Sequence, residues 1–178
     1  MEKLSKNITL FYKIKKVFFP FYKSRDVKKL FHILEKNEKN IQKNNQVAMF
    51  VGGCVRNFLT NENIDDIDIA SIFSPEEIKE KFKNSEFEVI DTGVDHGSVT
   101  VLINSSKFEI TTLRKDIKTD GRHAEVLFTD DWHQDSERRD FTINAIYMDR
   151  KGKIYDPQNG RDDLKKKKIK LLCLLVVV

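Results

Sequence analysis

The sequence predicts an α/β fold in which a small mixed or antiparallel sheet of about five strands carries its helices mainly on one face. Three observations predict it. Apolar runs of strand length alternate with segments whose apolar residues recur at helical spacing. A glycine pair at 52–53 breaks a buried apolar run just before a short helical segment. Apolar and acidic residues alternate over 64–70, which is typical of a strand with two different faces.

In chain order, the pattern predicts helices that begin near Asp26, Cys54, Ser74 and Trp132. The helix at Ser74 has a capping serine, Pro75 in the first position and acids in the first turn. The helix from Asp26 is expected to run to about Gln42. Strands are predicted at 47–51, 64–70, 87–90, 98–103, 107–113, 126–128, 145–148 and 153–155, with a hairpin turn at 104–106 and a polar loop at 115–125.

Composition limits the class of protein. The 178 residues are enough for one domain with a core. Charged residues make up 34%, and no apolar run reaches membrane-spanning length, so no membrane partner is expected. The net charge of +4 permits a polyanionic partner without demanding one. The two cysteines, Cys54 and Cys173, form no CxxC motif, and a reducing cytoplasm is the expected location.

Three regions are expected along the chain: a basic, aromatic extension at 1–24, a domain at 25–168 and an apolar tail at 169–178. The extension alternates lysines with aromatic residues, as an RNA-stacking strip or an amphipathic helix packed on the domain would. The tail is apolar on every face. It is interpreted as an edge strand that seeks a partner, or as a truncated or frame-shifted end.

The acidic strand carries the first candidate site. Asp66 and Asp68 project from the same strand face, where two carboxylates repel each other unless a cation or a donor network lies between them. Mg²⁺ prefers oxygen ligands and often shares them with substrate phosphates. The alternative is a solvated strand edge, which is common for so short a motif. Glu109 lies on a predicted strand that could pair beside this one, and three converging carboxylates could hold two Mg²⁺ ions.

Phosphate-binding candidates flank these acids. Backbone N–H groups after Gly52 and Gly53 would form an anion site at a helix N-terminus, with Arg56 on the first helical turn, although a plain tight turn would also contain two glycines.

A second basic motif follows further along the chain. Arg138 and Arg139 suit phosphate oxygens, with a solvated charge pair as the alternative. Asp140 could accept hydrogen bonds from a sugar hydroxyl or orient an arginine. Thr142 and Asn144 could equally be cap and turn residues.

Taken together and in order, these motifs resemble the head domain of the class II CCA-adding tRNA nucleotidyltransferase and bacterial poly(A) polymerase family. The resemblance covers about residues 25–165. It rests on the segments 51–56, 66–70, 74–77, 108–114, 120–123, 138–145 and 156–157. It implies a nucleotidyltransferase-type head fold and transfer of CMP and AMP from CTP and ATP to a tRNA 3′ end, with Mg²⁺ at a two-metal site.

The resemblance also implies a role for individual residues. Three acids would be catalytic and would bind the metal: Asp66, Asp68 and Glu109. Seven residues would bind the nucleotide: Gly52, Gly53, Arg56, Arg114, Arg138, Arg139 and Asp140. Arg114 and residues 120–123 match a flexible region near the catalytic acids.

Two departures from the family leave alternatives open. Asn57 stands where the family usually has Asp, which keeps the shape of the side chain but loses its charge. Family members also continue into helical neck, body and tail domains that select the base and hold the tRNA. The alternatives are therefore a poly(A) polymerase acting on another RNA 3′ end, or a split-gene fragment that binds nucleotide or RNA without complete activity and pairs with a separate neck and body polypeptide.

Overall fold

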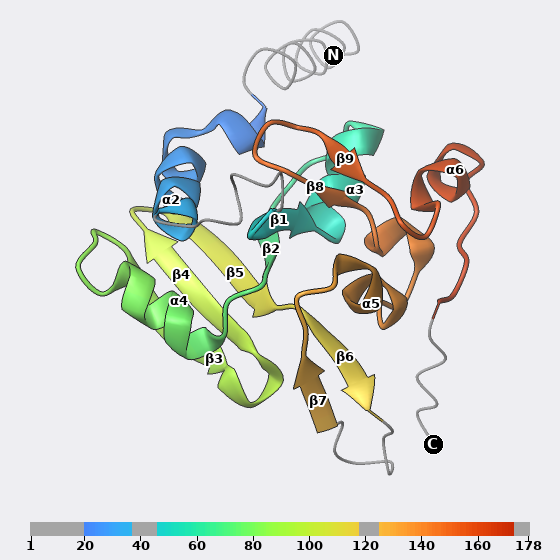
Figure 1. Cartoon of the computed structure of the whole chain (residues 1–178). Coiled ribbons are helices and arrows are strands. Elements are labelled where there is room, and N and C mark those ends of the chain that lie inside the picture. The colour runs from blue at the N-terminus through green and yellow to red at the C-terminus, as the bar shows by residue number, and fades with distance from the viewer. Residues whose placement is uncertain (1–19, 37–45, 118–124, 173–178) are drawn as a thin grey trace, which may run out of the picture.

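The computed structural model describes residues 20–36, 46–117 and 125–172. Within these ranges, a seven-stranded sheet has the order β3-β4-β5-β2-β1-β8-β9 (Figure 1). Its strands are β1 (Ala48–Val51), β2 (Ile67–Ser71), β3 (Glu88–Gly93), β4 (Ser98–Ile103), β5 (Ser106–Thr112), β8 (Tyr147–Met148) and β9 (Ile154–Tyr155). The α/β class is confirmed, and the strands number seven rather than about five because the two-residue strands β8 and β9 extend one edge.

The centre of the sheet is mixed. All four residues of β1 are buried, as expected for a strand covered on both faces. β1 runs antiparallel to β2, whereas β2 runs parallel to β5. The β2–β5 register places Asp68 directly opposite Glu109. The predicted pairing of the acidic strand with the Glu109 strand is therefore confirmed.

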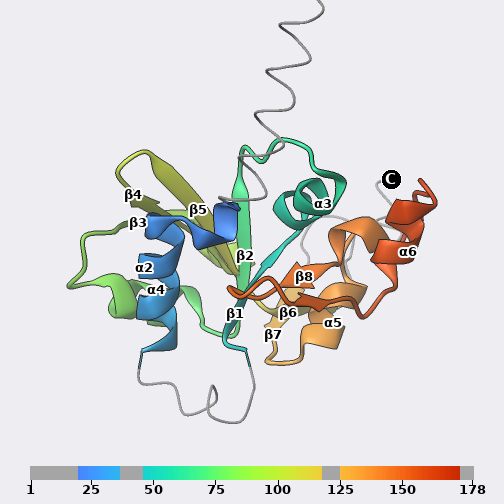
Figure 2. The same ribbon diagram turned by 90° about the horizontal axis from the view of Figure 1, so that it is seen from above.

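Three helices cover one face of this sheet: α2 (Arg25–Glu35), α3 (Gly53–Thr60) and α4 (Pro75–Phe82) (Figures 1 and 2). α2 begins where the Ser24 hydroxyl accepts a hydrogen bond from the Val27 amide, and α4 begins with the predicted cap at Ser74, completed by Glu77 as a capping box. The main core lies between these helices and the sheet. Its largest fully buried members are Phe31, Phe50, Phe82, Phe108, Leu30, Leu34, Ile69, Ile78, Ile110 and Ile146.

The opposite face of the sheet holds a smaller apolar cluster. It consists of Met49, Val51, Ala70, Leu113 and Tyr147, with Trp132 of α5 (Trp132–Glu137) packed against it. Because side chains alternate along a strand, Asp68 lies on the same sheet face as Ala70, and Glu109 shares it. This face therefore carries the acids, and α5 covers the part beside them.

The structure differs from the sequence prediction at several ends. β2 begins at Ile67, so Asp66 lies just before the strand rather than in it. α2 ends at Glu35, and residues 37–45 of the longer predicted helix lie outside the described residues. Part of the predicted polar loop forms a separate hairpin of β6 (Arg114–Ile117) and β7 (Glu125–Phe128), which extends away from the main sheet (Figure 1).

Further short elements complete the fold. They are 3₁₀ helices at Phe21–Lys23, Val94–His96 and Thr142–Asn144, and the helix α6 (Gly160–Lys165), which was not predicted. Among the described residues, no helix is both long and apolar enough to cross a membrane. The expectations for residues 1–19, 120–123 and 173–178 fall outside the described residues.

Candidate active site

Asp68 and Glu109 form the centre of the candidate site. They are direct neighbours on the parallel strands β2 and β5. Burial of the Asp68 carboxyl raises its pKa above the ordinary value, and the negative charges of Glu109 and Asp66 raise it further. Arg139 and Lys107 lower this pKa in part, so both cations lie within electrostatic reach of Asp68. The acids thus share a region of negative charge that nearby cations only partly offset.

The donor chemistry of this region fits a hard divalent cation, because carboxylate oxygens are its preferred ligands. Asp68 and Glu109 lie side by side, and the charge of Asp66 reaches Asp68. No group of three or more His, Cys, Asp or Glu side chains within the described ranges is already arranged to hold a metal ion. The three predicted ligands are therefore brought near one another, but without a ready-made three-ligand cage.

The glycine turn packs against the same acids. Gly52 has φ = 73° and ψ = −140°, a backbone conformation essentially restricted to glycine. A Cβ atom on Gly52 would lie 3.3 Å from Asp68 Oδ2, whereas one on Gly53 would lie 3.6 Å from the Arg56 guanidinium. The turn therefore brings bare backbone against Asp68 at the N-terminus of α3, where an anion is favoured.

Arg56 connects this turn to the second basic motif. Its Nη1 donates to Asn144 Oδ1 at 2.5 Å, and its Nε donates to Asn57 Oδ1 at 3.2 Å. Asn144 in turn donates from Nδ2 to both carboxylate oxygens of Asp140, at 3.0 and 3.2 Å. Asn144 thus bridges α3 and Asp140. Asn57, which stands where the family usually has Asp, also orients Arg56.

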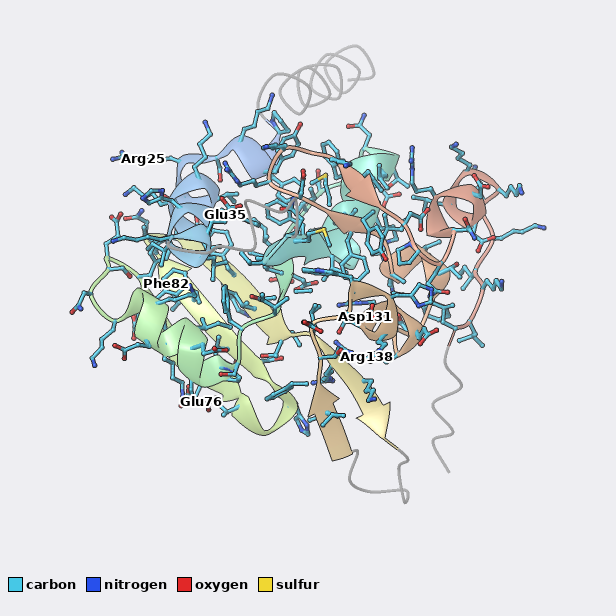
Figure 3. The ribbon with its side chains drawn as sticks, in the orientation of Figure 1. Arg25, Glu35, Glu76, Phe82, Asp131 and Arg138 are labelled. Atoms are coloured by element: carbon cyan, nitrogen blue, oxygen red, sulfur yellow. The ribbon has the colours of Figure 1, made fainter. Side chains whose placement is uncertain are left out.

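A buried carboxylate holds both arginines of the second motif. Asp135 is fully buried and accepts from Arg138 Nε at 2.9 Å, Arg139 Nη2 at 3.0 Å and the Tyr147 hydroxyl at 2.7 Å. Arg139 Nε also donates to the Tyr147 oxygen at 3.1 Å. Asp131 is the N-cap of α5 and Arg138 is its C-cap, and Figure 3 shows both residues beside this helix.

These contacts shift the pKa values of the group. Burial alone would raise the pKa of Asp135, but the positive charges of Arg139 and Arg138 and the Tyr147 hydrogen bond hold it below the usual value. Burial raises the pKa of the Tyr147 hydroxyl, which therefore stays protonated and can donate. The side chains of Arg138 and Arg139 are only 13% and 15% exposed, so each points its guanidinium from a fixed position.

Arg114 lies at the start of β6. Its amide donates to Asp135 Oδ1 at 3.2 Å, and its Nη1 donates to the His96 carbonyl oxygen. The Asp135 carboxylate therefore connects this residue to Arg138 and Arg139. The side chain of Arg114 is directed to the 3₁₀ helix Val94–His96.

The structure thus brings together two parts of the predicted site. The first contains Gly52, Gly53, Asp68 and Glu109, with Asp66 at its edge, and the second contains Arg56, Arg114, Arg138, Arg139 and Asp140.

Sequence reasoning missed Asp135 and Tyr147, and it gave Asn144 only a turn role. A signal existed for Asp135, since it precedes Arg138 and Arg139 by three and four residues on a helix, the spacing of neighbouring side chains.

With this geometry established, comparison with known proteins shows the family. Residues 48–170, more than half of the chain, match the family described as the poly A polymerase head domain. The chain belongs to this family. Among the relatives of this head domain are CCA tRNA nucleotidyltransferase 1, mitochondrial, of Danio rerio, which is 42% identical over 132 residues, and the CCA-adding enzyme of Lactobacillus delbrueckii subsp. bulgaricus, which is 48% identical over 125 residues.

Solved structures share the fold of this head domain. The crystal structure of the Bacillus stearothermophilus CCA-adding enzyme in complex with CTP has a TM-score of 0.67 and 32% sequence identity, and the match covers 84% of this chain and 34% of that one. The two relatives above are covered over 31% of their own length, and 74% and 69% of this chain is matched. The poly A polymerase head domain described here thus spans about a third of the length of these relatives.

Proposed function

We propose that this chain is the catalytic head of a tRNA nucleotidyltransferase that adds CMP and AMP, taken from CTP and ATP, to a tRNA 3′ end. The 3′-hydroxyl of the RNA attacks the α-phosphorus, the new P–O bond forms and pyrophosphate leaves. This reaction needs positioning and charge neutralisation more than covalent chemistry from the protein.

One observation carries the proposal. The bare backbone of the Gly52 turn lies against Asp68, and Asp68 lies in register with Glu109. A triphosphate at the N-terminus of α3 would therefore lie next to the acids. Arg56 is a residue of the same helix, and the positive charge of Arg139 acts on Asp68. Positive groups therefore also border the place where the phosphates would lie.

The proposal includes a divalent cation, which suits the oxygen donors of Asp68, Glu109 and Asp66. When bound, Mg²⁺ neutralises the triphosphate and activates the attacking hydroxyl. The rest of the work falls to residues of the chain. The Gly52 turn admits the phosphates, Arg56 and Arg139 stabilise their charge, and Asp140 is held by Asn144 where it can accept from a sugar hydroxyl.

The names of the relatives support CCA addition over poly(A) addition. Both curated relatives above are named for CCA addition, and one similar structure, with 29% identity and a TM-score of 0.55, is a tRNA nucleotidyltransferase complexed with a primer tRNA and an incoming ATP analog.

About two thirds of the length of these relatives has no counterpart in the 178 residues. We therefore propose that selection between C and A depends on groups outside this head, on the same or a separate polypeptide. Discrimination needs buried donors and acceptors on the base edge.

The decisive experiment supplies Mg²⁺, labelled CTP or ATP, and tRNA that lacks the last one, two or three nucleotides of its 3′ end. Because base selection is proposed to depend on groups outside this head, we expect the 178 residues alone to extend the tRNA poorly and with little preference between C and A, and a defined number of C and A residues only when those groups are supplied. A homopolymer of A would instead support the poly(A) polymerase alternative. Nucleotide binding without any extension, which a complementing neck and body polypeptide restores, would support the split-gene fragment.

Two variants separate the chemistry from the fold. Asp68→Ala should abolish extension while the far-ultraviolet circular dichroism spectrum stays unchanged. Asp65→Ala is the control, since it removes a neighbouring exposed acid that precedes β2. Full extension by the Asp68→Ala variant would refute the proposed role of the acids.

A further inference from the structure

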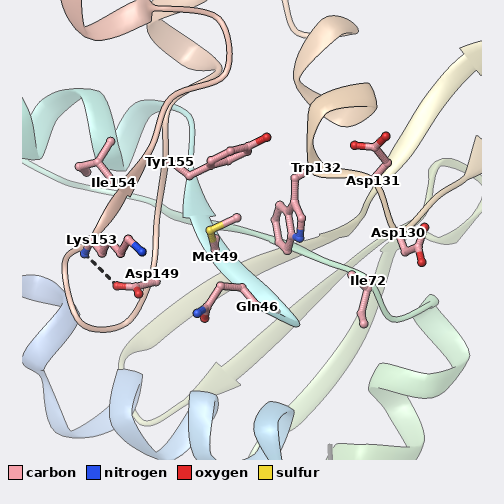
Figure 4. Close-up of a pocket in the computed structure, with 10 residues that line it drawn as sticks. All are labelled: Gln46, Met49, Ile72, Asp130, Asp131, Trp132, Asp149, Lys153, Ile154 and Tyr155. Carbon is pink, nitrogen blue, oxygen red and sulfur yellow. Dashed lines mark hydrogen bonds between the residues drawn. The ribbon is translucent and has the colours of Figure 1, made fainter. Parts of the chain in front are cut away.

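A concave region lies away from the candidate active site. It is a pocket of about 440 Å³, which is within the range of small-molecule sites. Ten residues line it, and none of them belongs to the predicted catalytic or nucleotide-binding set (Figure 4): Gln46, Met49, Ile72, Asp130, Asp131, Trp132, Asp149, Lys153, Ile154 and Tyr155.

The pocket lies toward the other end of β2 from the acids. Ile72 comes four residues after Asp68, a separation of about 13 Å along an extended chain. α5 lies between the two regions, because its first residue, Trp132, lines the pocket while Asp135 of the same helix holds the arginines. A ligand here would therefore not occupy the place proposed for the triphosphate.

Two aromatic rings line the pocket. Trp132 and Tyr155 both lie near Met49 in Figure 4. Both rings are fixed by contact with Tyr147, at centroid distances of 5.6 and 6.0 Å. Tyr155 is 39% exposed, so its ring borders an accessible space rather than filling a core. Aromatic faces of this kind attract cations through their negative π surfaces.

The side chains that line the pocket carry a net negative charge. Asp130, Asp131 and Asp149 contribute three carboxylates, against the single ammonium of Lys153. Asp131 also interacts electrostatically with Tyr155. Burial raises the pKa of the Tyr155 hydroxyl, and the negative charge of Asp131 raises it further. The lining therefore repels phosphates and favours a positively charged ligand.

Asp149 has a fixed place in the wall of the pocket. It is only 5% exposed, and its Oδ1 accepts from the Lys151 and Lys153 amides, each at 2.8 Å. Its carboxylate therefore adds a negative charge to the lining at a defined position.

We propose that this pocket binds an organic cation, with a guanidinium or ammonium group carried on an alkyl chain. The alkyl part packs on Met49, Ile72 and Ile154, the charged head lies between the aromatic rings, and the carboxylates neutralise it. The same chemistry is present in a free amine and in an arginine side chain of a basic peptide. Nucleotides and RNA backbones are excluded by their charge.

The chain offers a selective probe, because Trp132 is the only tryptophan among its 178 residues. Its emission therefore reports on the pocket alone. The full chain is titrated with agmatine at constant ionic strength, and a saturable change in tryptophan emission is expected. Butylurea, a neutral analogue, and ATP should each produce no saturable change. N-acetylarginine methylamide, which mimics an arginine within a peptide, separates the two sources of the cation. If it binds more tightly than agmatine, the natural ligand is an arginine side chain of a peptide; if it binds more weakly, the natural ligand is a free amine.

Charge variants test where the cation lies. Asp131→Asn keeps the cap of α5, since asparagine caps a helix as well as aspartate. This variant and Asp130→Asn should each weaken agmatine binding by about twofold to fivefold, the usual effect of one partly exposed charge pair. Asp162→Asn removes an equal charge from the exposed surface of α6 and should leave binding unchanged.

Three results would overturn the proposal: no saturable response to either cation, an equal response to butylurea, or equal weakening by Asp162→Asn and Asp131→Asn. None of them depends on nucleotide transfer. The test of this pocket and the test of the proposed enzyme can therefore fail separately.

Discussion

A Cβ atom on Gly52 would lie 3.3 Å from Asp68 Oδ2. Because glycine has no side chain, the backbone of the turn can lie close to this carboxylate. The positive φ of Gly52 holds this approach in place. Two segments 16 residues apart are thus in close contact, and the geometry of the acids depends on the absence of a methyl group.

Gly52→Ala should therefore damage both the fold and the site. An alanine in this conformation costs about 1–3 kcal/mol in the free energy of unfolding, and its methyl group displaces the Asp68 carboxylate. Denaturant unfolding measures the first effect, and nucleotide KM measures the second.

Gly53→Ala is the matched control for this prediction. Its φ does not lie in the region that favours glycine, and its Cβ would make an ordinary contact of 3.6 Å with Arg56. This variant should be close to wild type in stability. If Gly52→Ala unfolds at the same denaturant concentration as Gly53→Ala, the close approach does not constrain the turn.

The charge of Asp68 should destabilise the chain when no cation is present. Its folded-state pKa is raised by burial and by Glu109 and Asp66, so the folded protein binds this proton more tightly than the unfolded one. Stability then rises as the pH falls through the raised pKa. At neutral pH, Asp68→Asn should accordingly raise the melting temperature, and Asp65→Asn, at a neighbouring exposed acid, should not.

A Mg²⁺ titration extends this prediction to the metal. The cation should raise the melting temperature of the wild type, since it binds the folded chain and relieves the repulsion. Asp68→Asn should lose most of this increase, whereas Asp65→Asn should keep it. An equal Mg²⁺ effect in all three proteins would place the cation elsewhere.

The Asp135 carboxylate should be the most sensitive polar group of the second motif. Asp135→Ala leaves Arg138 and Arg139 buried without their partner, at a cost of about 3–5 kcal/mol in the free energy of unfolding. Tyr147→Phe removes one donor to the carboxylate and should cost about 1–3 kcal/mol. Glu137→Gln, on the exposed side of the same helix, should change stability little.

The same carboxylate predicts a pH dependence with a defined sign. The pKa of Asp135 is lower in the folded state than its ordinary value of 3.8, so its contribution to stability is fully present above that value. It is lost as the pH falls below 3.8 through the folded-state pKa. The difference in unfolding free energy between wild type and Asp135→Asn should therefore shrink below pH 3.8. A difference independent of pH would show that the charge of Asp135 is not responsible.

The sequence predicted the elements of the fold better than the partners of the site residues. Alternation over 64–70 located a strand, and the pairing of Asp68 with Glu109 followed because both strands were recognised. Asp135 was missed because its role depends on burial, and its spacing from Arg138 and Arg139 indicates an ion pair without showing that the pair is buried. The strands at 145–148 and 153–155 were predicted as a pair, but their addition to the edge of the main sheet, through the pairing of β8 with β1, was not, because a strand's partner distant in the chain leaves no mark on its own alternation.

The Asn144 amide supplies the last prediction, because it accepts from Arg56 and donates to Asp140. Asn144→Asp keeps the acceptor for Arg56 but places a carboxylate against Asp140, and like charges repel. We expect nucleotide KM to rise by about tenfold or more, equivalent to about 1.4 kcal/mol. Asn144→Ala should give a smaller rise, since it removes the bridge without adding repulsion. Asn104→Asp makes the same replacement in an exposed hairpin turn, where aspartate also tolerates positive φ, and should leave KM unchanged. If Asn144→Asp and Asn104→Asp have the same KM, Asn144 does not position Asp140 for the nucleotide.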